Sequence, residues 1–170
     1  MNTISENRNF QGINWSTLVM FALGFWLSAS LLLDAVIVPS LSAAGMMNQG
    51  GFANAGYLLF GIFNRLELIC AAIILTGFLV FSRYHSFSPS RQGWSIALAT
   101  LLLAIPLIYT YILTPQMSSL GLSLNLADTN EVMSPAMISM HGGYWVLEVV
   151  KFLAGATLLR WCYRDACKLV

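Results

Sequence analysis

Long apolar stretches dominate the pattern of hydrophobic and polar positions along the chain. Four of them are long enough to cross a bilayer as a helix, which takes about 20 residues. They run over residues 14–38, 56–81, 94–113 and 135–161. A helix is expected for each stretch, because a segment in lipid must satisfy its own backbone hydrogen bonds. The pattern predicts an all-α integral membrane four-helix bundle, with residues 1–170 forming a single transmembrane domain.

Composition also indicates that lipid is the solvent. Of the 170 residues, 58% are hydrophobic and only 9% are charged, whereas soluble domains carry about 25% charged residues. Mean hydropathy is +0.73. The net charge is only +1 and the chain has no basic tract, so no nucleic acid partner is expected.

The basic residues predict the orientation of the bundle. Lys and Arg residues precede the first span, lie between the second and third, and follow the fourth, whereas residues 39–55 and 114–134 contain none. Cytoplasmic loops carry such an excess of basic residues. Both the N and C termini are therefore predicted to be cytoplasmic. Trp15, Trp94 and Trp161 fall where the spans would meet that interface.

Two local features concern the third span and its exit. Pro106 lies inside the span and is expected to kink it, which membrane helices tolerate. Residues 120–126 alternate between apolar and polar positions. This period is typical of an extended segment, here one lying at the membrane interface, although such a short alternation also arises by chance.

Ionisable residues inside the predicted spans are the main functional signal. A charge near the bilayer centre costs at least about 2.5–3.5 kcal/mol on insertion scales, so such residues usually face the bundle interior and pair. The spans contain three acids, two bases and one histidine, a balance that would allow near-complete internal pairing. With an amide and a phenol, they define a candidate polar intramembrane cluster: Asp34, Asn64, Arg65, Glu67, His141, Tyr144, Glu148 and Lys151.

The fourth span carries the clearest pattern. Its polar residues recur every three or four positions, and at about 100° per residue they share a stripe about 80° wide. The stripe comprises Met137, His141, Tyr144, Glu148, Lys151 and Gly155. Two interpretations are open. Either Glu148 and Lys151 neutralise each other at i,i+3 and hold the bundle together, or the stripe lines an outward-facing polar cavity or a cofactor pocket.

Arg65 and Glu67 are two positions apart in the second span, so they project about 160° from each other on a helix. They are not expected to meet the same neighbour. One of them would face the cluster, where Arg65 would pair with Glu148 or Asp34. The other would need a different partner, for example across an oligomer interface. Charge reversal at Arg65 is then expected to destabilise the protein, with partial rescue by a compensating reversal at Glu148.

Two cofactors are compatible with the outer part of the fourth span. Met133, Met137 and His141 recur at i,i+4, and thioether and imidazole ligands suit copper(I), although methionine is also common as an adaptable apolar residue. Haem b is the other cofactor. Because His141 is the one histidine inside a span, only His/Met ligation or a haem shared by a dimer stays open.

Short motifs resemble a known family. They are the run Phe25–Pro39, the run Gly56–Glu67 and Met-His-Gly-Gly at 140–143. Together they resemble a family of four-helix bacterial membrane proteins that is classified as a domain of unknown function. That family is similar to the broader group that contains the copper-resistance D protein and a haem-binding protoporphyrinogen oxidase.

The resemblance implies a four-helix bundle and favours copper or haem. His141 would match the family's His-Gly in the last helix, and Arg65 would match its arginine in helix two. The first two helices resemble cyanobacterial members, which implies a multi-pass protein of a bacterial plasma membrane or a thylakoid membrane.

Two functional hypotheses follow. The first is a non-enzymatic membrane protein, because no catalytic triad, phosphate-binding glycine loop or Cys-x-x-Cys motif is present. Its outward-side polar cluster would serve binding, small-solute handling or assistance to a membrane complex. The second is a copper- or b-haem-binding membrane protein with redox activity. The lipid bilayer is the partner that both hypotheses require, and a homo-oligomer or a larger membrane complex is a further candidate partner.

Overall fold

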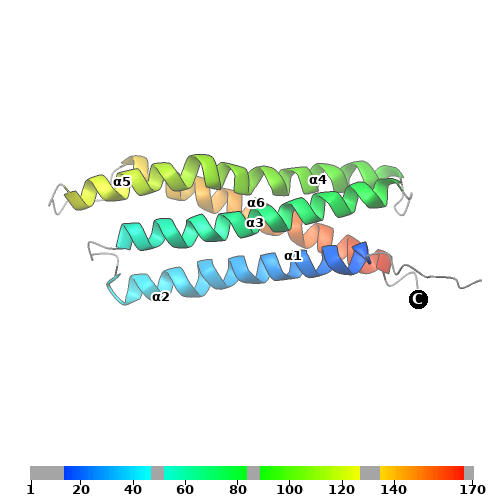
Figure 1. Cartoon of the computed structure of the whole chain (residues 1–170), viewed down its shortest axis with the longest axis horizontal. Coiled ribbons are helices and arrows are strands. Elements are labelled where there is room, and N and C mark those ends of the chain that lie inside the picture. Colours follow the sequence, from blue (N-terminus) through cyan, green and yellow to red (C-terminus); the bar gives the residue numbers. More distant parts are fainter. Residues whose placement is uncertain (1–13, 47–51, 84–88, 127–134, 167–170) are drawn as a thin grey trace, which may run out of the picture.

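Four long helical rods form the protein (Figure 1). The structure is a computed structural model that describes residues 14–46, 52–83, 89–126 and 135–166. The regular elements of this part are all helical. Each rod contains a segment long and apolar enough to span a membrane: Trp15–Ala43, Asn54–Arg83, Arg91–Leu120 and Pro135–Arg164. The prediction of an all-α four-helix membrane bundle is therefore confirmed.

Two of the four rods are interrupted by a π-helical turn. In chain order, the elements are α1 (Trp15–Leu32), η1 (Leu33–Ile37), α2 (Val38–Ala43), α3 (Phe52–Arg83), α4 (Pro89–Ile108), η3 (Tyr109–Leu113), α5 (Thr114–Leu126) and α6 (Pro135–Ala166). The first rod consists of α1, η1 and α2, and the third consists of α4, η3 and α5. The second and fourth rods are the single helices α3 and α6.

The rods pack as a closed square in which each helix contacts two others. α1 packs against α3, α3 against α4, α4 against α6, and α6 against α1. α3 and α6 therefore lie diagonally opposite each other. The start of α1, the end of α3, the start of α4 and the end of α6 lie at the same end of the bundle (Figure 1). We call this the terminal end and the other the distal end; the cytoplasmic location of the terminal end stays a prediction.

The rods extend beyond the predicted spans, mainly at the distal end. A span of 30 residues is about 45 Å long, whereas the hydrocarbon core is about 30 Å thick. The third rod differs most, because residues 114–126 form the helix α5. The extended segment predicted over residues 120–126 is wrong. The helix of the third span continues through these residues and pairs their backbone groups within itself, as it does inside the membrane.

The two π-helical turns lie in corresponding parts of the first and third rods. Pro106 lies inside α4, and the rod continues through it to the π turn that begins at Tyr109. The Thr110 hydroxyl donates to the Pro106 carbonyl at 2.7 Å and thereby satisfies it. The other π turn contains Asp34. Because π turns frequently occur at functional sites, these two segments direct attention to the region between them.

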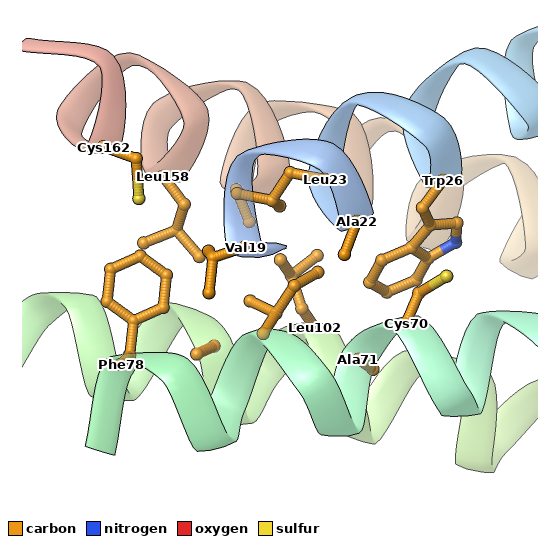
Figure 2. Close-up of a cluster of buried hydrophobic side chains, with 13 residues drawn as sticks. Val19, Ala22, Leu23, Trp26, Cys70, Ala71, Phe78, Leu102, Leu158 and Cys162 are labelled. Carbon is orange, nitrogen blue, oxygen red and sulfur yellow. The ribbon is translucent and has the colours of Figure 1, made fainter. Parts of the chain in front are cut away.

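An apolar core fills the terminal half of the bundle (Figure 2). All four rods contribute to this core: Val19, Ala22, Leu23, Trp26, Cys70, Ala71, Ile74, Phe78, Ala99, Leu102, Ala154, Leu158 and Cys162. Two glycines permit close packing against α1. A Cβ atom at Gly77 would collide with the Val19 side chain, and one at Gly155 would lie 2.8 Å from Leu27.

Candidate functional site

Lys151 of α6 is the centre of a buried polar cluster. Its Nζ atom lies 2.6 Å from Oε1 of Glu67 in α3 and 2.6 Å from Oε1 of Glu148, one turn earlier in α6. These three side chains are only 1–2% exposed. Because α3 and α6 lie diagonally opposite each other, the lysine links two rods whose backbones do not pack against each other.

Glu67 connects the lysine to α1. Its Oε1 atom also accepts hydrogen bonds from Trp26 Nε1 at 2.8 Å and from Ser30 Oγ at 3.2 Å. Trp26 therefore borders both the apolar core and the polar cluster. The second carboxylate oxygens of Glu67 and Glu148, both Oε2, are buried and have no hydrogen-bond partner among the described residues.

Aromatic rings enclose the lysine ammonium. Its Nζ atom lies 5.6 Å from the ring centre of Tyr109 and 5.9 Å from those of Trp26 and Phe152. Ring faces attract a cation at such distances, and the attraction is stronger away from water. The ammonium is therefore held by two carboxylates and by aromatic surfaces from three different rods.

A second polar pair lies nearer the distal end. The Tyr144 hydroxyl donates to Oδ1 of Asp34 at 2.6 Å. The ring of Tyr109 packs 5.1 Å from the ring of Tyr144, centre to centre, and its hydroxyl donates to the Tyr144 carbonyl at 3.4 Å. Asp34 and Tyr109 belong to the two π-helical turns. Both π turns thus supply side chains that meet α6 at this level.

The structure brings together five of the eight candidate residues of the cluster: Asp34, Glu67, Tyr144, Glu148 and Lys151. Asn64 lies at the distal edge, where its Nδ2 atom donates to Thr114 Oγ1 at 2.8 Å. It is buried and ties α3 to the start of α5.

Arg65 and His141 do not join this cluster. Arg65 is exposed on the outer face of α3, because it lies two positions from the inward-facing Glu67. Its predicted ion pair with Glu148 or Asp34 is not formed in the structure: Glu148 pairs with Lys151, and Asp34 accepts from Tyr144.

The structure describes two of the three candidate metal ligands of the outer part of α6, His141 and Met137. His141 is exposed, and its Nδ1 atom donates to the Met137 carbonyl at 2.9 Å. Met137 is buried, and Met133 lies outside the described residues. In the described part of the chain, no group of three or more His, Cys, Asp or Glu side chains could hold a metal ion. Methionine is not among these residue types, and the copper and haem hypotheses stay predictions.

Excess negative charge is the main chemical property of the cluster. The buried charged groups of the described residues are three carboxylates, on Asp34, Glu67 and Glu148, and one ammonium, on Lys151. If all four are ionised, the cluster carries two surplus negative charges. Buried charge without a counter-charge is costly, so such a site favours a bound proton or cation. The predicted charge balance had included Arg65 and His141, which lie elsewhere.

Aromatic residues indicate the level of the cluster in the bilayer. Exposed Trp94 lies toward the terminal end, and exposed Tyr111 and Trp145 lie toward the distal end, as in the aromatic belts at membrane interfaces. Trp94 and Tyr111 are about 26 Å apart along the helix, and Lys151 is about 9 Å from Trp145. The cluster therefore begins near the distal interface and ends inside the hydrocarbon layer.

Sequence reasoning missed three members of the cluster, namely Trp26, Ser30 and Tyr109. Trp26, Ser30 and Asp34 are spaced by four, so one face of the first helix was readable as a polar stripe. Tyr109 had no such signal, because its position depends on the π turn that begins with it.

Comparison with known proteins adds no relative to this picture. The chain matches no family model, no curated protein and no solved structure. Its function must therefore be argued from the geometry and charge of the cluster.

Proposed function

We propose that the protein is a non-enzymatic membrane protein that handles a small cation, either a proton or a monovalent metal ion, at the cluster around Lys151. One observation carries this proposal: the cluster contains three buried carboxylates but only one buried ammonium, which pairs with two of them. Oε2 of Glu67 and Oε2 of Glu148 have no hydrogen-bond partner among the described residues and are suitable acceptors for a proton. A metal ion would find only these two carboxylates as protein ligands, because no three His, Cys, Asp or Glu side chains of the described residues form a metal site.

Lys151 has a structural role in this proposal. Its ammonium holds Glu67 and Glu148 in place, at 2.6 Å from each, and its charge cancels only part of theirs. The site thus stays assembled without a ligand and still attracts positive charge. A third carboxylate, on Asp34, lies toward the distal end with the Tyr144 hydroxyl as its partner.

The cation would enter and leave at the distal end. On that side the polar residues continue to Asp34 and Tyr144, whereas the apolar core fills the terminal half. Among the described residues of that half, the one buried polar side chain is Ser95, whose hydroxyl donates to the Arg91 carbonyl of its own helix. With the predicted orientation, the site is outward-facing, and it suits one-sided binding rather than conduction.

The test measures the thermal stability of the purified protein in detergent with Na⁺, K⁺ or choline at constant ionic strength and several pH values. A ligand at 100 times its Kd stabilises the folded state by about 2.7 kcal/mol. We expect stabilisation by a metal ion or by lower pH, and its loss in Glu148→Gln. The matched control Asp165→Asn, about 25 Å along the helix from position 148, should retain it.

An infrared spectrum distinguishes the proton from the metal ion. A protonated carboxyl band at neutral pH that disappears in Glu148→Gln supports the proton, whereas metal-specific stabilisation without that band supports the ion. The absence of both would overturn the proposal. A Soret band or stoichiometric copper that is lost in His141→Ala would instead support the copper or haem hypothesis.

A further inference from the structure

Arg65 is a charged side chain on the outer surface of a membrane-spanning helix. It is exposed, and its guanidinium has no ion-pair or hydrogen-bond partner among the described residues. A charged side chain on a lipid-facing surface is costly at the bilayer centre, and the cost falls where the charge reaches the headgroups. The guanidinium of Arg65 therefore needs a partner outside the described bundle.

The level of Arg65 along the bundle limits what that partner can be. The hydrogen bond between Asn64 and Thr114 places Arg65 level with the start of α5, one turn beyond the exposed Tyr111. Arg65 lies about 27 Å from Arg83, which begins the polar connection at the terminal end. This distance approaches the hydrocarbon thickness of about 30 Å. Arg65 is therefore close to the distal membrane interface.

The surroundings of Arg65 are those of a lipid-facing surface. Exposed apolar side chains flank it at helical spacing: Leu58 at 63%, Ile62 at 67% and Ile69 at 58% exposure. Helical side chains lean toward the N-terminus of their helix, which for α3 is the distal end. The guanidinium thus extends toward the headgroups of the distal leaflet, while Ile69 faces the acyl chains below.

The described spans of a second copy of this chain would not supply the missing counter-charge. The acidic side chains within the described spans, Asp34, Glu67 and Glu148, are all buried. A symmetric dimer through this face would also bring two Arg65 side chains together, which repel. Lipid phosphate has the required charge, and a guanidinium binds it with two parallel hydrogen bonds.

We propose that Arg65, with Ile62 and Ile69 beside it, binds the phosphate headgroup of an anionic phospholipid in the distal leaflet. This site lies on the outside of the bundle and is independent of the cation site at Lys151. It would fix the depth and the rotation of α3 in the bilayer.

The test uses native mass spectrometry of the full chain released from nanodiscs that contain phosphatidylcholine with a minor share of phosphatidylglycerol. We expect retained phosphatidylglycerol in the wild type and about five-fold weaker retention in Arg65→Gln, which corresponds to about 1 kcal/mol. Arg65→Lys should keep most of the binding. The matched control Arg160→Gln removes an exposed arginine from the terminal end and should keep the selectivity for this site.

Each other result overturns the proposal. Equal retention by wild type and Arg65→Gln would show that the arginine does not bind the lipid. Dissociation of a dimer by Arg65→Gln, without any dependence on phosphatidylglycerol, would identify a protein partner instead. Because Arg65 is exposed, the variants are expected to fold, and Arg65→Lys reports on the charge even if Arg65→Gln does not.

Discussion

The terminal and distal halves of the bundle use the same four rods but fill their interior differently. In the terminal half, apolar side chains from all four rods interlock around Leu102 and Leu158 (Figure 2). In the distal half, Lys151 and three carboxylates occupy the interior, with π turns in two of the rods. Dispersion and close packing stabilise the first half, whereas the stability of the second depends on how its buried charges are compensated.

The difference teaches where the protein can respond to its environment. Both interiors are buried, but only the distal one contains charged groups to which the proposed proton or ion would bind. The boundary between them is Trp26, whose ring belongs to the apolar core while its Nε1 atom donates to Glu67. We therefore expect substitutions on the two sides of Trp26 to differ in how much stability they remove and in whether that loss depends on the ions present.

The largest effect is expected for Lys151→Met in the distal half. Removing one partner of a buried ion pair costs about 3–5 kcal/mol, because it leaves an uncompensated buried charge. Unfolding of the purified protein in detergent, followed by circular dichroism, measures the loss, with Arg160→Met as the exposed control. A loss below about 1 kcal/mol would contradict the presence of ionised carboxylates around Lys151 and would mean that protons already neutralise them.

A similar or smaller loss is expected for Leu158→Ala in the terminal half. Leu158 is fully buried, and such a truncation costs about 2–5 kcal/mol through lost packing and a cavity. The same unfolding measurement should show no dependence on the choice of cation. Leu153→Ala on the same helix, where the side chain is 66% exposed, should cost little. Equal losses in the two variants would refute the assignment of the core.

An intermediate effect is expected for Tyr144→Phe. It removes the hydroxyl that donates to Asp34 at 2.6 Å, and a hydrogen bond to a charged group contributes about 1.5–3 kcal/mol. Stability should fall and the response to added cation should change. Tyr111→Phe, which alters a tyrosine that is 73% exposed, should leave both unchanged. An unchanged Tyr144→Phe variant would place Asp34 outside the functional cluster.

The smallest effect is expected for Gly77→Ala, which would press a methyl group into Val19 across the contact of α1 with α3. Overpacking of this kind costs about 1–3 kcal/mol. Gly24→Ala is the matched control, because nothing lies within 4 Å of a Cβ there, and alanine favours a helix over glycine. Destabilisation by Gly24→Ala as large as by Gly77→Ala would contradict the packing of α1 on α3.

Much of the cluster could be predicted because helical spacing places residues on one face. Glu148 and Lys151 were expected to pair at i,i+3, and their Nζ to Oε1 distance is 2.6 Å. Spacing also predicted that Arg65 and Glu67 project in different directions. It does not say which of the two faces inward, because that depends on how α3 is rotated against its neighbours.

The sequence by itself determined the solvent, the number of spans and the helical class, because a continuous apolar stretch of about 20 residues in lipid satisfies its own backbone hydrogen bonds as a helix. Only the tertiary structure decided the electrostatics of the site. Packing turned Arg65 outward and Glu67 inward. It also placed the Glu67 carboxylate within reach of Lys151, which comes from the diagonally opposite helix α6. A helix specifies the angles between its own side chains, whereas contacts with other helices decide which of them share a buried space.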